Sequence, residues 1–129
     1  ARDIERMERH LASIDQALET GRLGASPDLA FHRDLATASR NPVLDDFMRF
    51  LNTKVSGMIR MARKKSNQDP ALAARVQDEH REILDAVASG DSERARRAVL
   101  SHMQKGALRQ GLEIVIPGGP RDQGRHLEP

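Results

Sequence analysis

Residues 80–102 read HREILDAVASGDSERARRAVLSH, and they hold two helical patterns separated only by Gly90 and Asp91. Before this break, Ile83 and Val87 continue an apolar stripe at the spacing of one helix face. Glycine favours the end of a helix, and aspartate favours the cap that begins the next one. Because almost no loop remains between the two helices, we expect them to form an antiparallel hairpin.

Three more helical segments precede this hairpin. Proline after a capping residue is typical of a helix N-terminus, and this pair occurs three times: Ser26-Pro27, Asn41-Pro42 and Asp69-Pro70. Apolar stripes run along four of the five expected helices. They comprise Ile4, Met7, Leu11, Ile14 and Leu18 in the first helix, Leu44, Phe47, Leu51, Val55, Met58 and Ala62 in the third, Leu72, Val76, His80, Ile83 and Val87 in the fourth, and Ala95, Val99 and His102 in the fifth. No strand alternation is sustained, so the sequence predicts an all-α antiparallel bundle with five visible helices.

The third expected helix runs unbroken from Asn41-Pro42 to a basic stretch, Arg60, Arg63, Lys64 and Lys65. A basic run can indicate nucleic-acid binding. Cations in the last turn of a helix also complement its dipole, and we favour this second interpretation for all four residues.

One domain is expected over residues 1–116, because 129 residues can bury a single core. Residues 113–116 are short and apolar, and would extend the last helix or pack as a strand. The remaining segment, PGGPRDQGRHLEP over residues 117–129, has the composition of a flexible tail. Because the first residue is Ala and helical pattern begins almost at once, we expect the chain to be a fragment or a trimmed product.

Composition excludes several classes of function. The chain has no cysteine, which rules out disulfides and thiolate metal sites and fits a cytoplasmic location. With 21 basic and 19 acidic residues the net charge is only +2, which argues against a dedicated nucleic-acid surface. Trp and Tyr are absent, so no aromatic platform for stacking bases is expected. No apolar run approaches the roughly 18 residues of a membrane span, so no membrane partner is expected.

Asp28 and His32 are the first candidate site residues, because a separation of four places both on one face of a helix. His80 lies on the apolar stripe of the fourth helix, and His102 lies on the apolar stripe of the fifth. Helices two and four run parallel in an up-down bundle. Counting about 1.5 Å per residue from the turns at 40/41 and 90/91 therefore places all four residues in one layer about a helical turn thick. One carboxylate and three imidazoles suit Zn, Ni, Mn, Co or Fe(II).

Three interpretations of this layer stay open from the residues alone. The histidines could be packed core residues of a helical interaction module, although burying them with a carboxylate and no cation costs several kcal/mol. A metal with an open position could activate water in a small helical metalloenzyme, but no nucleophile or general base adjoins the cluster. An octahedral metal could instead leave two positions for a bidentate small acid.

Two stretches resemble the motifs of a known family. DLAFHRDLATASRNPVL (residues 28–44) and DEHREILDAVASGDSERARRAVLSHM (residues 78–103) are similar to the two motifs of the FCD domain, the C-terminal effector-binding domain of FadR-type regulators in the GntR family. The resemblance covers about residues 3–110. It implies an antiparallel bundle of six or seven helices that senses a ligand, catalyses no reaction and forms a homodimer. DNA would be bound only by a separate winged helix-turn-helix domain, absent from this chain.

The resemblance also implies roles for individual residues. In the metal-binding branch of the family, the matching positions hold a divalent metal, here Asp28, His32, His80 and His102. Effectors in this family are commonly small organic acids held at or near the metal. Members often hold the acid with an arginine on an N-terminal helix that this chain lacks. Candidate substitutes within this chain are Arg60, Lys105 and Arg109.

Overall fold

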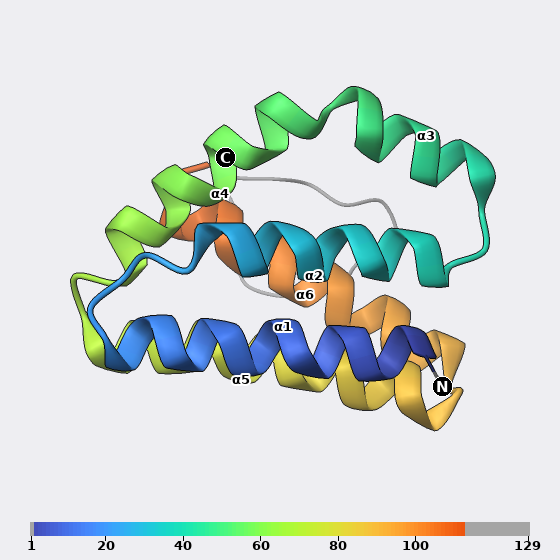
Figure 1. Cartoon of the computed structure of the whole chain (residues 1–129), viewed down its shortest axis with the longest axis horizontal. Helices are drawn as coiled ribbons and strands as arrows, with labels where there is room; N and C mark the ends of the chain where they lie inside the picture. The colour runs from blue at the N-terminus through green and yellow to red at the C-terminus, as the bar shows by residue number, and fades with distance from the viewer. Residues whose placement is uncertain (1, 113–129) are drawn as a thin grey trace, which may run out of the picture.

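The computed structural model describes residues 2–112, which form six helices in an antiparallel bundle (Figure 1). The helices are α1 Arg2–Glu19, α2 Ala25–Ala38, α3 Pro42–Phe50, α4 Asn52–Ser66, α5 Pro70–Ser89 and α6 Ser92–Arg109. No strand occurs within these residues, so the all-α prediction is confirmed. The apolar segment 113–116 and the expected tail 117–129 lie outside the described residues.

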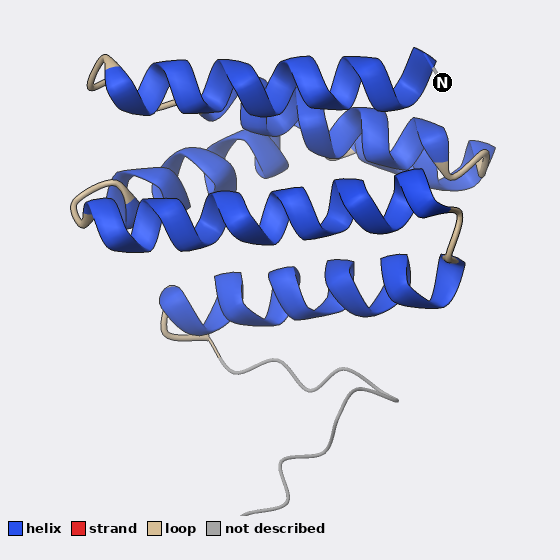
Figure 2. Ribbon diagram, turned by 90° about the horizontal axis from the view of Figure 1, so that it is seen from below, coloured by secondary structure: helices blue, strands red, loops and turns tan. Residues whose placement is uncertain are grey.

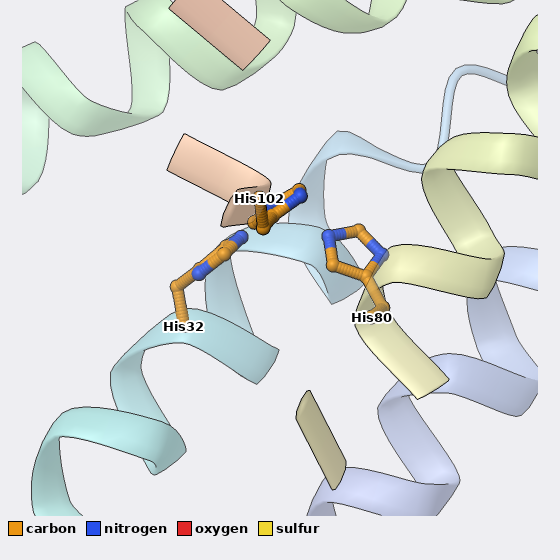
Figure 3. A group of neighbouring side chains, drawn as sticks. All are labelled: His32, His80 and His102. Atoms are coloured by element: carbon orange, nitrogen blue, oxygen red, sulfur yellow. The ribbon is translucent and has the colours of Figure 1, made fainter. Parts of the chain in front are cut away.

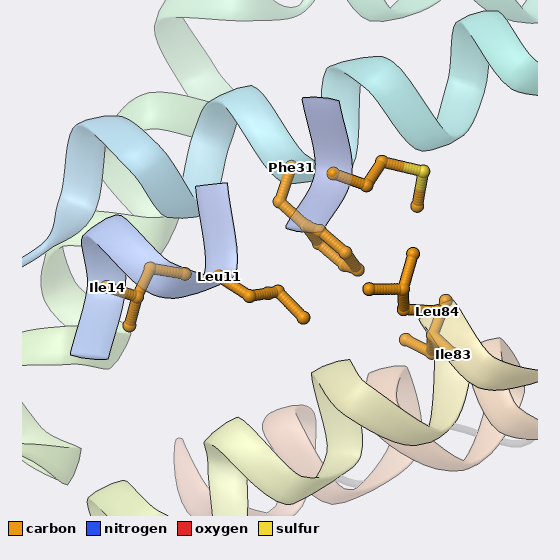
Figure 4. Close-up of a cluster of buried hydrophobic side chains, with 6 residues drawn as sticks. Leu11, Ile14, Phe31, Ile83 and Leu84 are labelled. Carbon is orange, nitrogen blue, oxygen red and sulfur yellow. The ribbon is translucent and has the colours of Figure 1, made fainter. Parts of the chain in front are cut away.

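The core lies where α1, α2 and α5 meet. Figure 2 shows α1, α5 and α6 side by side with α5 in the middle, and α2 packs along α1. Phe31 of α2 lies among aliphatic side chains of α1 and α5 (Figure 4). The buried cluster comprises Met7, Leu11, Ile14, Phe31, Ile83 and Leu84. These residues confirm most of the stripe expected on the first helix and part of the stripe expected on the fourth.

Three helix starts follow the predicted capping residues. The Asn41 side chain accepts hydrogen bonds from the backbone N–H groups of Val43 and Leu44. Asp69 and Asp91 cap α5 and α6 in the same way, each accepting one backbone N–H at 3.0 and 2.9 Å. The hairpin of α5 and α6 therefore forms as the sequence predicts.

The predicted cap at Ser26 is wrong. Helix α2 begins at Ala25, and its N-cap is Gly24, which has a φ of 76°. A β-carbon on Gly24 would lie 3.4 Å from Cβ of Ala17, so the turn before α2 packs against α1. Its left-handed backbone conformation favours glycine at this position. Ser26 is an exposed residue inside the first turn, where it makes no capping hydrogen bond.

The expected unbroken third helix is also wrong, because the chain leaves helical geometry at Leu51 and forms α3 and α4. The following Asn52 and Thr53 are weak helix formers, and the Asn52 side chain accepts a hydrogen bond from Arg33 of α2. This break separates a short helix that contacts only α2 and α4 from a longer one that also reaches α5 and α6.

The apolar stripe expected across this segment is wrong in part. Leu44, Phe47 and Met58 are 39%, 55% and 67% exposed, and none of the residues of α3 is buried. Leu44 and Phe47 precede the break and lie on a short helix that contacts only α2 and α4, whereas Leu51, Val55 and Ala62 are partly buried. The buried residues of α4 are instead Arg63 and Ser66. Among the described residues, none of the six helices is long and apolar enough to cross a membrane.

Removing a side chain that caps a helix should destabilise the fold more than removing Ser26, which forms no capping hydrogen bond. We expect Asp91→Ala to lower the free energy of unfolding by about 1 kcal/mol, because the Arg94 backbone N–H loses its acceptor. Ser26→Ala should change it by less than about 0.5 kcal/mol. Urea denaturation of the three proteins measures both effects, and equal losses for the two variants would contradict this account of the helix starts.

Candidate metal centre

Three histidines meet in the bundle, one each from α2, α5 and α6. Figure 3 shows the side chains of His32, His80 and His102 converging, and one ring nitrogen of each lies within 4.8 Å of the others. The rings of His32 and His102 are stacked with centroids 5.4 Å apart, and His80 meets His102 edge-on at 4.6 Å. His80 is fully buried, while the other two are partly buried. The three histidines, which counting the helical rise placed in one layer, therefore lie together although they are far apart in the sequence.

Asp28 lies against the same cluster, one helical turn before His32. Its Oδ1 atom is 3.1 Å from Nε2 of His32 and 3.6 Å from Nε2 of His80. Burial alone would raise the pKa of Asp28, but the adjoining His32 imidazole and Arg63 guanidinium outweigh it and hold the pKa well below its usual range. The carboxylate is therefore charged at neutral pH.

Two polar side chains of α5 fix the rings of His80 and His102. Nδ1 of His80 lies 3.0 Å from Oε1 of Gln77, whose amide nitrogen donates to the Leu11 carbonyl at 2.9 Å. Nδ1 of His102 lies 2.8 Å from Oε1 of Glu79. Because both partners accept at Nδ1, they favour the tautomers in which Nε2 carries a lone pair.

Gln77 and Glu79 were not expected from the sequence. A Gln or Glu within three residues of a core histidine was the signal that could have found them. Carboxylates or amides that hold the second ring nitrogen are the usual companions of metal-binding histidines.

Glu79 is itself held from a second side. Arg109 donates to both of its oxygens at 2.8 Å, so the carboxylate accepts three hydrogen bonds from charged or ring nitrogens. Burial opposes ionisation, but the hydrogen bonds from His102 and Arg109 lower the pKa of Glu79 to about 2. Arg109 thereby acts on the cluster through Glu79 and His102.

Arg63 has a role that was not predicted from the sequence. The dipole interpretation gave it no role beyond the end of its helix, but its side chain is only 3% exposed and its Nε donates to Oδ2 of Asp28 at 2.7 Å. Helix α4 packs against α2, α5 and α6, and this packing brings Arg63 to Asp28. The periodicity of the basic stretch could not show this, since Arg63 lies beside exposed lysines in the sequence.

Orphaned polar atoms mark the centre of the cluster. Oδ1 of Asp28 and Nε2 of His80 are both buried and have no hydrogen-bond partner among the described residues. Burial lowers the pKa of His80 well below its ordinary value, so this ring is neutral and Nε2 offers a lone pair. Two lone-pair donors aimed into one buried space, beside two further imidazoles, fit a divalent transition metal.

The three cations expected to bind an effector occupy different surroundings. Arg60 is exposed on α4. Lys105 and Arg109 line a groove of about 520 Å³ between α5 and α6, together with His102 and Glu79. Both hydrogen-bonding ends of the Arg109 guanidinium are engaged by Glu79, whereas Lys105 is exposed.

Acid should weaken the fold partly through Glu79. Its pKa is lowered from 4.5 to about 2, so its ion pair stabilises the folded state fully above pH 4.5, and this stabilisation is lost as the pH falls toward 2. We expect Glu79→Gln, without metal, to be less stable at neutral pH and to lose less stability across this interval. Urea denaturation at several pH values measures both. Asp78→Asn, which removes an exposed carboxylate from the same helix, is the control, and equal losses for all three proteins would contradict the assignment.

Comparison with known proteins identifies the family. The model of the FCD domain matches residues 1–105. The HTH-type transcriptional regulator LutR of Bacillus subtilis (strain 168) is 32% identical over 102 residues, which are 78% of this chain and 47% of that protein. The putative L-lactate dehydrogenase operon regulatory protein of Escherichia coli (strain K12) is 27% identical over 104 residues, 81% of this chain and 38% of that protein. The chain thus spans less than half the length of these curated relatives. It belongs to the FCD domain family, and its relatives are GntR-type transcription regulators.

Proposed function

We propose that this chain is the ligand-sensing domain of a bacterial GntR-family transcription regulator of the FadR type. A divalent metal held by Asp28, His32, His80 and His102 would anchor a small carboxylate effector. The observation that carries the proposal is the convergence of three histidines and one charged carboxylate, with orphaned donor atoms aimed into the same buried space.

The protonation states of the cluster support a metal. A metal ligand must be a neutral imidazole or an ionised carboxylate, and His80 and Asp28 have these forms at neutral pH. Gln77 and Glu79 hold the Nδ1 atoms of two rings, which leaves Nε2 for the metal. Zn, Ni, Mn, Co and Fe(II) all accept this donor set. When bound, such an ion would supply positive charge and open coordination positions for an oxygen ligand.

The proposed effector is a small organic acid. Two relatives are named as putative regulators of an L-lactate dehydrogenase operon, which favours an acid of the size of lactate. Lys105 and Arg109 lie on the groove beside His102, and Arg60 lies on α4, so these three remain candidate contacts for the acid. A regulator is favoured over a metalloenzyme because the curated relatives are named as regulators.

Effector binding would act through a change in conformational population. A ligand shifts an equilibrium between two bundle conformations by its difference in affinity for them. In a cytoplasmic homodimer, that shift would alter the spacing of two winged helix-turn-helix domains and hence their fit to two half-sites on DNA. DNA would be bound only by those domains, and the bundle itself would contact neither DNA nor membrane.

The metal is tested by thermal unfolding of protein purified without a nickel column. Adding Zn, Ni or Mn at about 100 times the dissociation constant should stabilise the fold by about 2.7 kcal/mol, because the ion binds only the folded state. For a chain of this size, that corresponds to a rise in Tm of roughly 5–15 °C. Asp28→Ala and His102→Leu should lose this increment, and elemental analysis should find about one ion in the wild-type chain.

His10→Gln is the matched control, since His10 pairs with Asp34 away from the cluster. It should keep the full metal-dependent increment. If His80→Leu and His102→Leu are neutral or stabilising and no metal copurifies, the histidines are packed core residues of an interaction module and the metal proposal fails.

A further inference from the structure

We infer that Arg63 forms an anion subsite beside the metal and holds the carboxylate of the effector through its two terminal nitrogens. This inference rests on the proposed function, which supplies the metal and the acid, and it adds a residue that the candidate contacts Arg60, Lys105 and Arg109 do not include. The effector class becomes an acid whose carboxylate binds Arg63 and whose second oxygen faces the metal.

The first support is the state of the Arg63 guanidinium. Nε donates to Oδ2 of Asp28 at 2.7 Å, but Nη1 and Nη2 are both buried without a hydrogen-bond partner among the described residues. Leaving charged donors buried and unpaired costs more than leaving neutral ones unpaired. A buried guanidinium with a single acceptor therefore needs a second one.

Arg109 shows what a fully paired arginine looks like in this chain. Both of its terminal nitrogens donate to the oxygens of Glu79 at 2.8 Å, so its paired edge is filled by one carboxylate. Arg63 donates to Asp28 through Nε alone. Pairing with Asp28 alone thus does not account for Arg63, because it leaves the Nη1–Nη2 edge without an acceptor.

The geometry of that edge selects the ligand. Nη1 and Nη2 lie in one plane and present parallel N–H bonds, which match the two oxygens of a carboxylate. A hydroxyl or an amide oxygen offers one uncharged acceptor atom in place of two that share a negative charge. The free edge of Arg63 therefore favours a carboxylate over a neutral alcohol or amide of the same size.

Asp28 connects Arg63 to the histidine cluster. One carboxylate oxygen accepts from Arg63, and the other lies 3.1 Å from His32 Nε2 and 3.6 Å from His80 Nε2. Asp28 thus links Arg63 directly to the residues that would hold the metal. A 2-hydroxy or 2-oxo acid carries a second oxygen next to its carboxylate, so one small molecule can offer a carboxylate to Arg63 and an oxygen to the metal.

Charge balance gives an independent reason for an anion. With neutral histidines, a bound divalent ion, the Arg63 cation and the Asp28 anion leave a net charge of +2 in a buried place. Glu79 does not offset this charge, because Arg109 already neutralises it. Buried charge is costly unless it is paired, so an anionic ligand is favoured at this position.

The inference is tested with zinc-loaded chain and L-lactate as the probe, with lactamide as its uncharged counterpart. We expect lactate, and not lactamide, to raise the Tm of the wild-type chain. Arg63→Met, of similar length but uncharged, should bind zinc at the same stoichiometry and weaken lactate by about tenfold or more, since it loses a charge-assisted pair of hydrogen bonds. Arg63→Lys should also weaken lactate, because a lysine keeps the charge but lacks the paired donors.

Lys64→Met is the matched control, as Lys64 is exposed on the next position of the same helix and should keep the wild-type response. A normal lactate response in zinc-loaded Arg63→Met would overturn the inference and leave the metal proposal intact. So would zinc-loaded wild-type chain that responds equally to lactate and lactamide, or to neither. Failure of the wild-type chain to bind zinc would overturn the proposed function, and the inference with it.

Discussion

The carboxylate of Asp28 is the interaction on which the site depends. It is nearly inaccessible to water, yet it stays ionised because Arg63 lies on one oxygen and two imidazoles lie near the other. A buried charge of this kind must be paired, so α4 and α5 have to bring their cationic and polar groups to α2.

Two carboxylates near the cluster play opposite parts. Glu79 is saturated, because His102 and Arg109 fill its oxygens and hold its pKa near 2. It is therefore a fixed support that orients a ring. Asp28 keeps one buried oxygen without a hydrogen bond, next to a histidine nitrogen in the same state. Unsatisfied buried donors and acceptors are rare in folded proteins, and a pair of them at one place is expected where a ligand binds.

The features that could be predicted from the sequence are those with local causes. Asn41, Asp69 and Asp91 cap helices through bonds to residues two or three positions away, and the depth of His80 and His102 follows from the rise of a helix counted from one tight turn. The features that failed depend on distant contacts. Arg63 is buried where α4 packs against α2, α5 and α6, and nothing in its neighbours along the chain distinguishes it from the exposed lysines that follow it.

The helices that supply the proposed ligands suggest how effector binding would change the conformation of the bundle. Under the proposed function, α2, α5 and α6 supply every metal ligand, whereas Arg63 of α4 supplies only an anion contact. A metal alone would then join three helices and leave α4 attached through Asp28. An acid between Arg63 and the metal would join α4 to the other three helices. The effector would bind more tightly to the bundle conformation in which α4 lies against the metal site. Adding acid to metal-loaded protein would therefore change the position of α4.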